Sequence, residues 1–510
     1  MSAPAENNAS DEATNKPGSK KLLRSKFFWV ALLYFSEGFP LGAFYDIFPV
    51  YFRNQGVELS KIGLLSLLGL AWTLKFLWAP AIDYLRHHRY WMVAADCIMG
   101  VVMLSFAIDS GFGPWVWIAI GIFTVMSATN DIATDGYTIE LLNKEELGLA
   151  NGIRIGFYRV GMLSAGGVLI VSGYYGWTMA FIVAALISLV CAVISLAAPR
   201  ELPRPVSART TSLRSEFAGI VAQPQWVFAI VLLVAGLVWP VLIVLDVEAL
   251  KPYQKLWWFK GGIPISAILG AALIAAFAAR RTIKKPADNG LQQGPMFGAL
   301  IDLLSRPGML PVMVFILVFK LADASMGFMV KPFWVDSGFS NERIGFVSVN
   351  IGLLLSIAGG LAGGWYTDRV GIFKALWVLG LWQAISNLGY VAAAWWIPLQ
   401  AQGAEIPLAH MALMYSASAI ESFTQGLGSA AFLAFLMAIV SKKHSTTEYA
   451  ILSSIFAFSR SIAGWAGGIG AQEMGYVNYF LLTFFLAFPA YLLLGPVRRM
   501  LNTTEHRAPA

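Results

Sequence analysis

The sequence predicts an all-α integral membrane protein, and three observations support this fold class. Of the 510 residues, 57% are hydrophobic and only 13% are charged, whereas soluble domains carry about 25% charged residues. Apolar runs of about 20 residues, which are long enough for a helix to cross a bilayer, recur along nearly the whole chain. The sequence also contains an internal repeat. A string of soluble domains is excluded, because such domains do not need membrane-length apolar runs.

The net charge of +7 does not indicate a nucleic-acid partner. The basic residues lie mostly in short loops between apolar runs, which is the positive-inside pattern of a bacterial inner-membrane protein. Cys97 and Cys191 both fall inside apolar runs, so the sequence offers neither a disulfide framework nor a metal-ligand spacing. Its loops contain no nucleophile–base arrangement. We therefore predict that the protein is not an enzyme and has no cofactor and no metal site.

The apolar runs predict fourteen membrane spans and five segments. Residues 1–26 are a disordered cytoplasmic tail, because they are polar and low in aromatic residues up to the basic stretch before the first span. Residues 27–198 are a six-helix bundle (the first half), and 309–497 are a second one (the second half). Residues 199–308 are a linker with two extra spans, and 498–510 are a cytoplasmic tail. The spans lie at about 27–52, 62–82, 90–108, 114–142, 150–171, 177–197, 226–246, 263–279, 309–335, 344–366, 375–397, 411–440, 450–471 and 477–496.

This count places both termini and most Arg/Lys-rich loops in the cytoplasm. One loop disagrees, since Lys251, Lys255 and Lys260 would lie on the outer side. The prediction of the two extra spans is therefore the part of the topology that the charge pattern supports least.

The internal repeat supports the division into two halves. Residues 52–63 (FRNQGVELSKIG) and 334–345 (WVDSGFSNERIG) share aromatic, glycine, basic and Ile-Gly positions. Further along, 159–167 (RVGMLSAGG) matches 460–468 (RSIAGWAGG). Two six-span halves repeated in the same order are the plan of major facilitator transporters, whose substrate site lies midway through the membrane between the halves.

A loop in each half resembles the signature loop of this superfamily. In the second half it is 364–374 (GWYTDRVGIFK), and in the first half it follows Asp83. Basic groups there can bind the C-terminal carbonyls of nearby helices, and the aspartate can cap a helix start. We predict that these loops hold one end of the protein shut. The predicted gating residues are Asp83, Arg86, Arg89, Asp368, Arg369 and Lys374.

Four stretches of the first half resemble the AmpG muropeptide permease branch of the major facilitator superfamily, which is related to acetyl-CoA transporters. They are 74–83 (LKFLWAPAID), 130–137 (NDIATDGY), 145–148 (EELG) and 158–167 (YRVGMLSAGG). The resemblance also implies fourteen spans. The chain departs from the branch at 86–89, where it has RHHR in place of a Gly-Arg-Arg-rich loop.

Charged residues inside the predicted spans mark the candidate site. On insertion scales a charged side chain at mid-membrane costs about 2.5–3.5 kcal/mol, so such groups must face each other or a water-filled cavity. Asp131 and Asp135 share one face of the fourth span with Thr and Ser residues at three- and four-residue steps. Counting residues across the loop at a helical rise, we expect Arg159 to pair with Asp135 or Asp131. A purely structural ion pair is the alternative.

The remaining intramembrane polar residues complete the prediction. Lys75 is too deep to reach the interface comfortably, whereas Lys320 and Asp323, one helical turn apart, can simply neutralise each other. We expect Asp46 and Asp96 to be structural. The predicted proton-coupling residues are Asp131, Asp135, Glu37, Asp323 and Glu421. The predicted substrate-binding residues are Lys75, Arg154, Arg159, Lys320, Gln425 and Arg460, with Tyr34, Tyr45 and Trp72 as candidate sugar-stacking aromatics.

The resemblance implies a proton-coupled symporter that imports anionic anhydro-muropeptides across the inner membrane. Its partners are then a small anionic substrate, protons and the lipid bilayer, and we expect a monomer. Buried cations suit a substrate with carboxylates, and protonating a buried acid lowers the cost of moving it out of water. The alternatives are a transporter of acetyl-CoA or another organic anion, and a membrane-embedded sensor with this fold and no flux.

Overall fold

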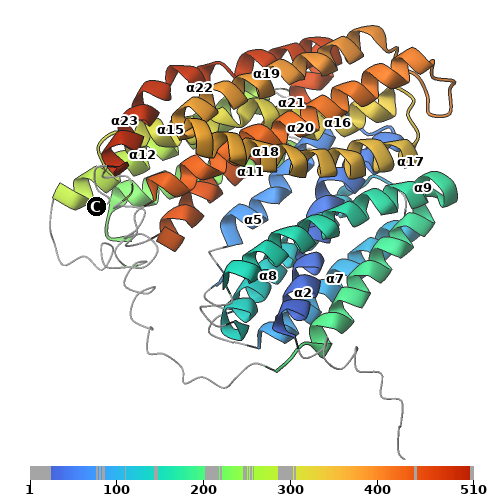
Figure 1. Ribbon diagram of the computed structural model, residues 1–510, viewed down its shortest axis with the longest axis horizontal. Coiled ribbons are helices and arrows are strands. Elements are labelled where there is room, and N and C mark those ends of the chain that lie inside the picture. The colour runs from blue at the N-terminus through green and yellow to red at the C-terminus, as the bar shows by residue number, and fades with distance from the viewer. Residues whose placement is uncertain are drawn as a thin grey trace, which may run out of the picture.

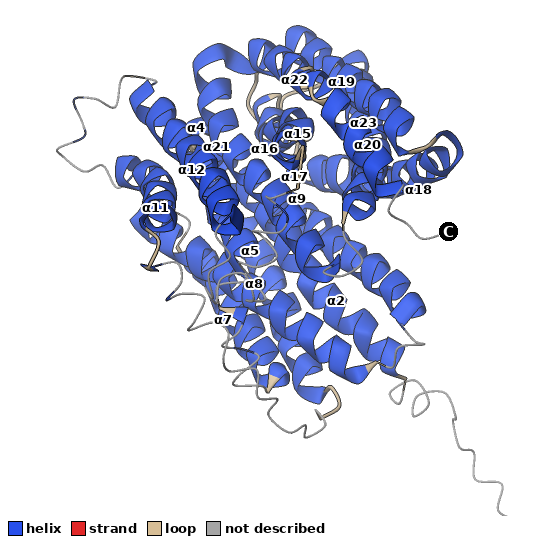
Figure 2. Ribbon diagram, turned by 90° about the vertical axis from the view of Figure 1, so that its left-hand side faces the viewer, coloured by secondary structure: helices blue, strands red, loops and turns tan. Residues whose placement is uncertain are grey.

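The computed structural model describes residues 25–505 except 76–77, 80–81, 83–86, 110, 143–146, 201–217, 219–220, 245–249, 251, 253–255, 257, 285–302, 304–305 and 441–444. Within this part of the chain every named element is a helix (Figure 2). The predicted all-α fold class is therefore confirmed. In Figure 1 the helices of the first half, blue to green, form one group, and those of the second half, yellow to red, form another.

The first half begins with a long helix that changes its winding twice. It consists of α2 (Lys26–Gly42), the π-helical segment η1 (Ala43–Ile47) and α3 (Phe48–Asn54). The next segment is shorter and comprises α4 (Leu59–Leu65), η2 (Ser66–Gly69) and α5 (Leu70–Leu74). Three helices follow: α7 (His88–Ile108), α8 (Pro114–Leu141) and α9 (Leu147–Ala197).

Two further helices separate the halves. They are α11 (Pro224–Val244) and α12 (Ile263–Lys284), with the short η6 (Trp258–Gly262) before α12. They pack closely on each other, because Gly236 lets α11 approach the carbonyl of Pro264 and the side chain of Ile268. Trp239 donates a hydrogen bond to the carbonyl of Phe259 at 2.9 Å.

The second half repeats this plan with different breaks. Its first helix is interrupted at Lys320, between α15 (Met309–Phe319) and α16 (Leu321–Asp336). The others are α17 (Asn341–Arg343), η7 (Ile344–Ile351), α18 (Gly352–Val370), α19 (Ile372–Trp396), α20 (Leu408–Ile439), α21 (Ser445–Leu486), α22 (Pro489–Leu492) and α23 (Leu494–Glu505). Helix α23 extends into 498–510, which the sequence predicted as a tail.

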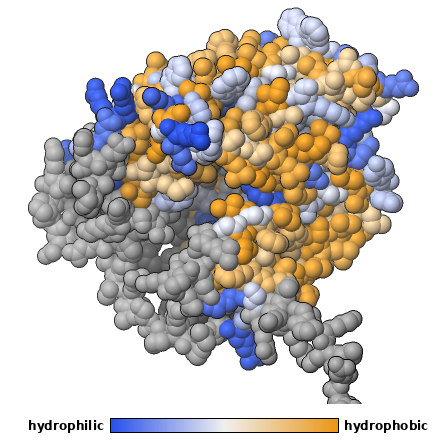
Figure 3. All heavy atoms as spheres, viewed as in Figure 1, coloured by the Kyte–Doolittle hydropathy of each residue, from blue (hydrophilic) through white to orange (hydrophobic). Residues whose placement is uncertain are grey.

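Length and composition agree with a membrane protein. In the described part of the chain, nine helical stretches are long and apolar enough to cross a bilayer, and three shorter apolar helices accompany them. Two of the nine turn back at a glycine, so they are not single straight spans. Figure 3 shows broad apolar areas over both groups of helices, with a narrow strip of hydrophilic atoms between them. The exact number of spans stays a prediction.

The sequence repeat is visible in the backbone. Gly56 (φ 73°) and Gly338 (φ 86°), which match in the repeat, both adopt the left-handed conformation that favours glycine. Gly176 (φ 81°) turns α9 back on itself, and Gly475 (φ 72°) does the same in α21. All four glycines belong to one end of the molecule, where α9 meets α17 in Figure 1. We call this the joined end, and the opposite end the loop end.

Two close approaches made by repeat glycines bring the halves together. Gly63 lies against Gly468 and Gly464 of α21, where an added Cβ would lie 2.6 Å from the Gly468 Cα. Its repeat partner Gly345 lies against Gly166 of α9, where an added Cβ would overlap the Gly166 carbonyl oxygen. Small residues at such positions let membrane helices approach closely. The repeated glycines therefore form two matching contacts between the halves.

Polar contacts add to the joined end. Arg53 Nε donates to Asp336 Oδ1 at 2.5 Å, and Tyr476 donates to the other oxygen of Asp336 at 2.6 Å. Deeper between the halves, Lys331 Nζ lies 3.5 Å from Asp46 Oδ1. Asp46 thus pairs across the halves, in agreement with the structural role expected for it.

Candidate functional site

The fourth predicted span corresponds to α8, which presents two carboxylates, Asp131 and Asp135, to neighbouring helices. Lys75 Nζ, at the end of α5, lies 3.3 Å from Asp131 Oδ2. Arg154 Nη2, from α9, lies 2.9 Å from Asp135 Oδ1. Tyr34, from α2, donates a hydrogen bond to that same oxygen at 2.6 Å. Four helix segments therefore converge on two acid–base pairs.

The predicted pairing of Arg159 is wrong, since Arg154 takes that position. Asp135 lies six residues before the end of α8 at Leu141, and Arg154 lies seven residues after the start of α9 at Leu147. Similar distances from the helix ends give similar depths at about 1.5 Å per residue. The prediction counted residues 142–146 as part of a helix, and this shifted the expected partner.

Glu37 is the third acid of this site. It is buried on α2, within Coulombic range of Asp131 and Asp135 as well as of Lys75 and Arg154. Its Oε2 atom is buried without a hydrogen-bond partner. Burying an ionised, unpartnered carboxylate is costly, and a bound proton removes most of that cost. We call Tyr34, Glu37, Lys75, Asp131, Asp135 and Arg154 the first-half charge cluster.

This cluster is accessible as well as charged. The side chains of Arg154 and Asp135 are 40% and 32% exposed, and that of Lys75 is 33% exposed. Arg154 also stacks its guanidinium over the Tyr34 ring at 4.6 Å, which is a cation–π contact. The Asp131 carboxylate is more deeply placed. Ligands and protons can therefore reach part of the cluster.

The second half holds a different cluster around Lys320. Lys320 Nζ lies 2.9 Å from Ser429 Oγ, 3.1 Å from Gln383 Oε1 and 3.4 Å from Asp323 Oδ2. The lysine side chain is only 2% exposed. Gln425 reaches Asp323 Oδ1 at 3.5 Å. We call Lys320, Asp323, Gln383, Gln425 and Ser429 the second-half cluster.

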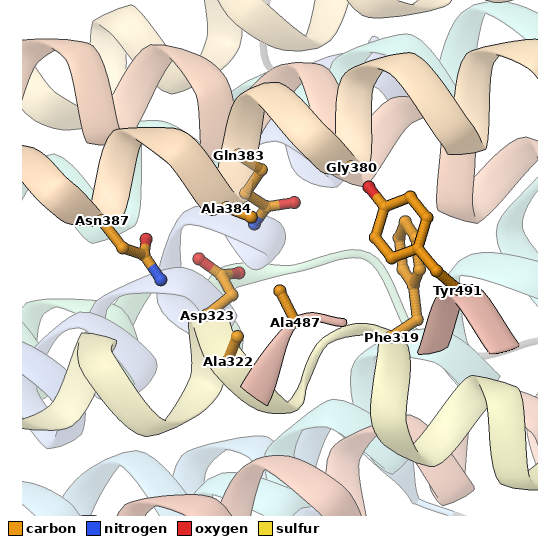
Figure 4. A pocket seen from close by; sticks show the side chains of 9 residues that line it. All are labelled: Phe319, Ala322, Asp323, Gly380, Gln383, Ala384, Asn387, Ala487 and Tyr491. Carbon is orange, nitrogen blue, oxygen red and sulfur yellow. The ribbon is translucent and has the colours of Figure 1, made fainter. Parts of the chain in front are cut away.

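A small polar cavity borders this second cluster. Figure 4 shows the Asp323 carboxylate of α16 pointing toward α19, between the side chains of Asn387 and Gln383. Phe319 and Tyr491 close the other end beside Gly380. The expected neutralisation of Lys320 by Asp323 agrees with this geometry. Lys320 makes a full set of contacts inside its own half.

Glu421 lies next to the second-half cluster, within Coulombic range of Lys320. It is buried on α20, and its carboxylate accepts a hydrogen bond from Ser422 at 3.3 Å. It lies within Coulombic range of Asp323 and Lys331. Asp96 is also fully surrounded, because Ser36, Asn130 and Ser195 all donate to it. This agrees with the structural role expected for Asp96.

Two arginines, one from each half, lie within Coulombic range of each other. Arg159 of α9 and Arg460 of α21 are close enough to repel one another, and the described residues place no carboxylate within ion-pair distance of either guanidinium. Arg460 lies 3.9 Å above the Tyr45 ring, and Trp72 stacks on Tyr45 with ring centroids 6.5 Å apart. The result is a pair of cations beside an aromatic surface.

The predicted gating residues are only partly described. Asp83 and Arg86 lie outside the described residues, whereas Arg89 donates to the Leu196 carbonyl oxygen. Asp368, Arg369 and Lys374 are exposed around Gly371, whose φ of 84° ends α18. These three belong to the loop end.

Sequence reasoning missed Arg53, Lys331, Asp336 and Tyr476, which link the halves. Arg53 and Asp336 lie 283 residues apart in the chain, so no local spacing connects them. The available signal was their position beside the repeated glycines Gly56 and Gly338. A charged residue next to each repeated turn indicates a contact at the joined end.

Comparisons with known proteins agree with this arrangement. The model of the Major Facilitator Superfamily matches residues 30–281. The chain is 12% identical to an auto-inhibited POT family peptide transporter of known structure, with a TM-score of 0.67 over 95% of this chain and 97% of that one. A nucleoside transporter, NupG, aligns with a TM-score of 0.59 over 93% and 99%. The matching model, the solved structures and the apolar helices together show a multi-pass membrane protein with the major facilitator fold.

The chain resembles the AmpG-like transporters, as its sequence motifs predicted. It is 24% identical to the Anhydromuropeptide permease of Escherichia coli K12, over 93% of this chain and 80% of that protein. It is 22% identical to Putative transporter AmpG 4 of Rickettsia felis, over 94% and 97%. An uncharacterized protein of Haemophilus influenzae is 25% identical over 96% and 98%. The proteins that this chain resembles are thus named as transporters and permeases rather than as enzymes.

Proposed function

We propose that the protein is a proton-coupled symporter that imports anionic anhydro-muropeptides across the inner membrane. The observation that carries this proposal is the pair of guanidiniums, Arg159 and Arg460, which come from opposite halves and lie within Coulombic range of each other. Arg460 lies over the ring of Tyr45, which stacks on Trp72. Among the described residues neither guanidinium has a carboxylate within ion-pair distance, although Asp46 lies within Coulombic range of Arg460. Two such cations favour an anionic partner when they are desolvated. The aromatic surface beside them suits the apolar face of a sugar ring.

The substrate class is supported by the named relatives. One is an Anhydromuropeptide permease and others are putative AmpG transporters. A muropeptide carries peptide carboxylates and sugar rings, so it offers groups for both the arginines and the aromatics. Planar guanidiniums bind carboxylates with two parallel hydrogen bonds, which adds geometric selectivity.

The first-half charge cluster supplies the proton site in this proposal. It holds three acids, Glu37, Asp131 and Asp135, but only two cations, Lys75 and Arg154. The excess acid must carry a proton when water is excluded. Binding and release of that proton then accompany the change of access from one side of the membrane to the other.

Access would alternate by movement of 27–198 against 309–497, with α11 and α12 in the linker outside this movement. The contacts at the joined end support a conformation closed there. The protein would act as a monomer with both termini in the cytoplasm, as the positive-inside pattern indicates. The loop end would then face the cytoplasm.

Uptake into proteoliposomes tests the proposal. Labelled anhydro-muropeptide should accumulate under an imposed inward proton gradient, and labelled acetyl-CoA should not. Accumulation of acetyl-CoA alone would support the second candidate, an organic-anion transporter, for which the arginine pair is equally suited. Flux of neither compound would contradict the transport proposal.

Variants of the arginine pair sharpen this test. Loss of one charge-assisted hydrogen bond costs about 1.5–3 kcal/mol, so Arg159→Gln and Arg460→Gln should each raise the KM for muropeptide about 10- to 100-fold. Arg343→Gln is the matched control, because Arg343 is exposed at the joined end and contacts Met411. Equal KM values in all three variants would contradict a role of Arg159 and Arg460 in substrate binding.

A further inference from the structure

A basic groove at the loop end of the second half is separate from the site described above. It is open on one side and has a volume of about 630 Å³. Its walls come from the end of α18, the start of α19 and the α22–α23 segment. The lining residues are Tyr366, Arg369, Val370, Phe373, Lys374, Trp377, Val378, Tyr491 and Leu494.

The groove combines positive charge with aromatic and apolar surface. Arg369 and Lys374 are two of its walls, and Arg498 of α23 adds a third cation, 5.5 Å from the centre of the Phe373 ring. No acid belongs to the lining, although the exposed Asp368 is adjacent in sequence to Arg369. The groove is therefore complementary to an anion.

The side chains next to the groove are those of a protein surface within a bilayer. Trp377 is about half exposed, and Leu492 and Trp365 are exposed on the neighbouring turns. Tyr491 donates a hydrogen bond to the Trp377 carbonyl at 3.1 Å, which fixes one aromatic wall. Trp and Tyr are enriched where a membrane protein meets the headgroup layer.

Helix α23 strengthens this assignment. It buries Leu494, Val497 and Leu501 in the core, and it exposes Arg498 and Arg499. An amphipathic helix with basic residues on its polar face is typical of the interface between protein and anionic lipid. It places cations at the same level as Arg369 and Lys374, around one groove.

We propose that this groove binds the headgroup of an anionic glycerophospholipid. The phosphodiester lies among Arg369, Lys374 and Arg498, and the acyl chains run over the apolar surface beside Trp377. A soluble phosphate would use the cations but not the aromatic and apolar walls. A zwitterionic lipid would use the walls, but its ammonium group would oppose the three cations.

The test uses the purified full-length protein and measures lipid binding without any transport assay. Each cation near an anionic headgroup contributes about five-fold in affinity, so three predict a preference on the order of 100-fold for phosphatidylglycerol over phosphatidylcholine. The measurement is competition between the two lipids, followed by native mass spectrometry of the protein released from mixed micelles. Equal binding of the two lipids by the wild-type protein would overturn the proposal, and so would displacement of phosphatidylglycerol by millimolar inorganic phosphate.

Variants locate the site. Arg369→Gln/Lys374→Gln/Arg498→Gln should reduce the lipid preference to near one, whereas Arg281→Gln/Arg343→Gln, which neutralises exposed cations elsewhere, should leave it unchanged. Should the triple variant fail to fold, Lys374→Gln alone should lower the preference about five-fold. An unchanged preference in the groove variants would place the lipid elsewhere and contradict the proposal.

Discussion

The two charge clusters, one in each half, contrast in accessibility. In the first-half charge cluster, the paired side chains of Lys75, Asp135 and Arg154 are about one-third exposed, and acids outnumber cations. In the second-half cluster, Lys320 is buried and has a hydrogen-bonding or ionic partner on each of α16, α19 and α20.

This difference separates two uses of charge within one membrane protein. A buried ion pair with complete hydrogen bonding is hard to open, because separating it leaves an uncompensated charge. A half-exposed cluster with an excess acid can exchange protons and partners at lower cost. We infer that the second-half cluster stabilises the fold and that the first-half charge cluster couples proton movement to transport.

The largest expected effect tests the structural side of this contrast. Lys320→Met leaves the Asp323 carboxylate buried with little compensation, and breaking such a pair costs about 3–5 kcal/mol. The variant should show a large loss of folded protein in the membrane and a lower unfolding temperature in detergent.

Lys61→Met is the matched control for Lys320→Met. Lys61 also pairs with an acid three residues away, Glu58 at 3.6 Å, but both side chains are exposed. Its replacement should cost less than about 1 kcal/mol. Lys320→Met/Asp323→Asn should recover part of the lost stability, because no unpaired charge remains. Equal effects at Lys61 and Lys320 would contradict the assignment of the second-half cluster to the fold.

The next effect concerns the joined end. Gly345→Ala places a Cβ against the backbone of Gly166, and overpacking of this kind costs about 1–3 kcal/mol. The strain falls only on the conformation closed at the joined end, so its population should drop at least five-fold. In a protein lacking Cys97 and Cys191, labelling of a Ser348→Cys reporter by a membrane-impermeant maleimide should become correspondingly faster.

Gly167→Ala is the control for this experiment, since no atom lies within 4 Å of an added Cβ at Gly167. It should leave the labelling rate unchanged. If labelling became faster in both variants, or in neither, the claim that the Gly345–Gly166 contact helps to close the joined end would be contradicted.

A comparable cost is expected at the loop end, from backbone strain alone. Gly371 has φ 84° and ψ 152°, a region that is essentially restricted to glycine, and forcing another residue into it costs about 1–3 kcal/mol. Nothing lies within 4 Å of an added Cβ at Gly371 or at the helical Gly364. Gly371→Ala should therefore lower the unfolding temperature, whereas Gly364→Ala should keep or raise it. A change of the unfolding temperature in the same direction for both variants would contradict a strained, glycine-specific backbone conformation at Gly371.

The smallest expected change in stability belongs to the first-half charge cluster. Arg154→Gln removes a partly exposed ion pair, so the free energy of unfolding should fall by less than about 1 kcal/mol. Proton-driven uptake should nevertheless decrease strongly, because Asp135 loses its cation. Loss of folded protein on the scale of Lys320→Met would show that the two clusters do not differ in the way inferred here.

The sequence predicted contacts that follow from spacing within one helix or from the internal repeat. The repeat identified Gly63 and Gly345 as equivalent positions, and the structure places both at contacts between the halves. One-turn spacing was enough to pair Lys320 with Asp323. These are local patterns, which helix geometry translates directly into proximity.

Other contacts needed information that local patterns lack. The partner of Asp135 depended on where α8 ends and α9 begins, and the residues between them moved the pairing from Arg159 to Arg154. The Arg53–Asp336 pair required the docking of two halves 283 residues apart. Such contacts depend on the three-dimensional approach of the bundles, which no spacing within one segment specifies.

The most direct test of the coupling claim compares two transport modes in one variant, Asp135→Asn. Counterflow of labelled anhydro-muropeptide needs substrate binding and a change of access but no net proton movement, so it should persist. Accumulation driven by an imposed pH gradient should be lost, because two acids and two cations then remain in the cluster and no excess acid is left to take up a proton. Accumulation at the wild-type level in Asp135→Asn, in protein shown to be folded, would contradict a coupling role for this carboxylate in the first-half charge cluster.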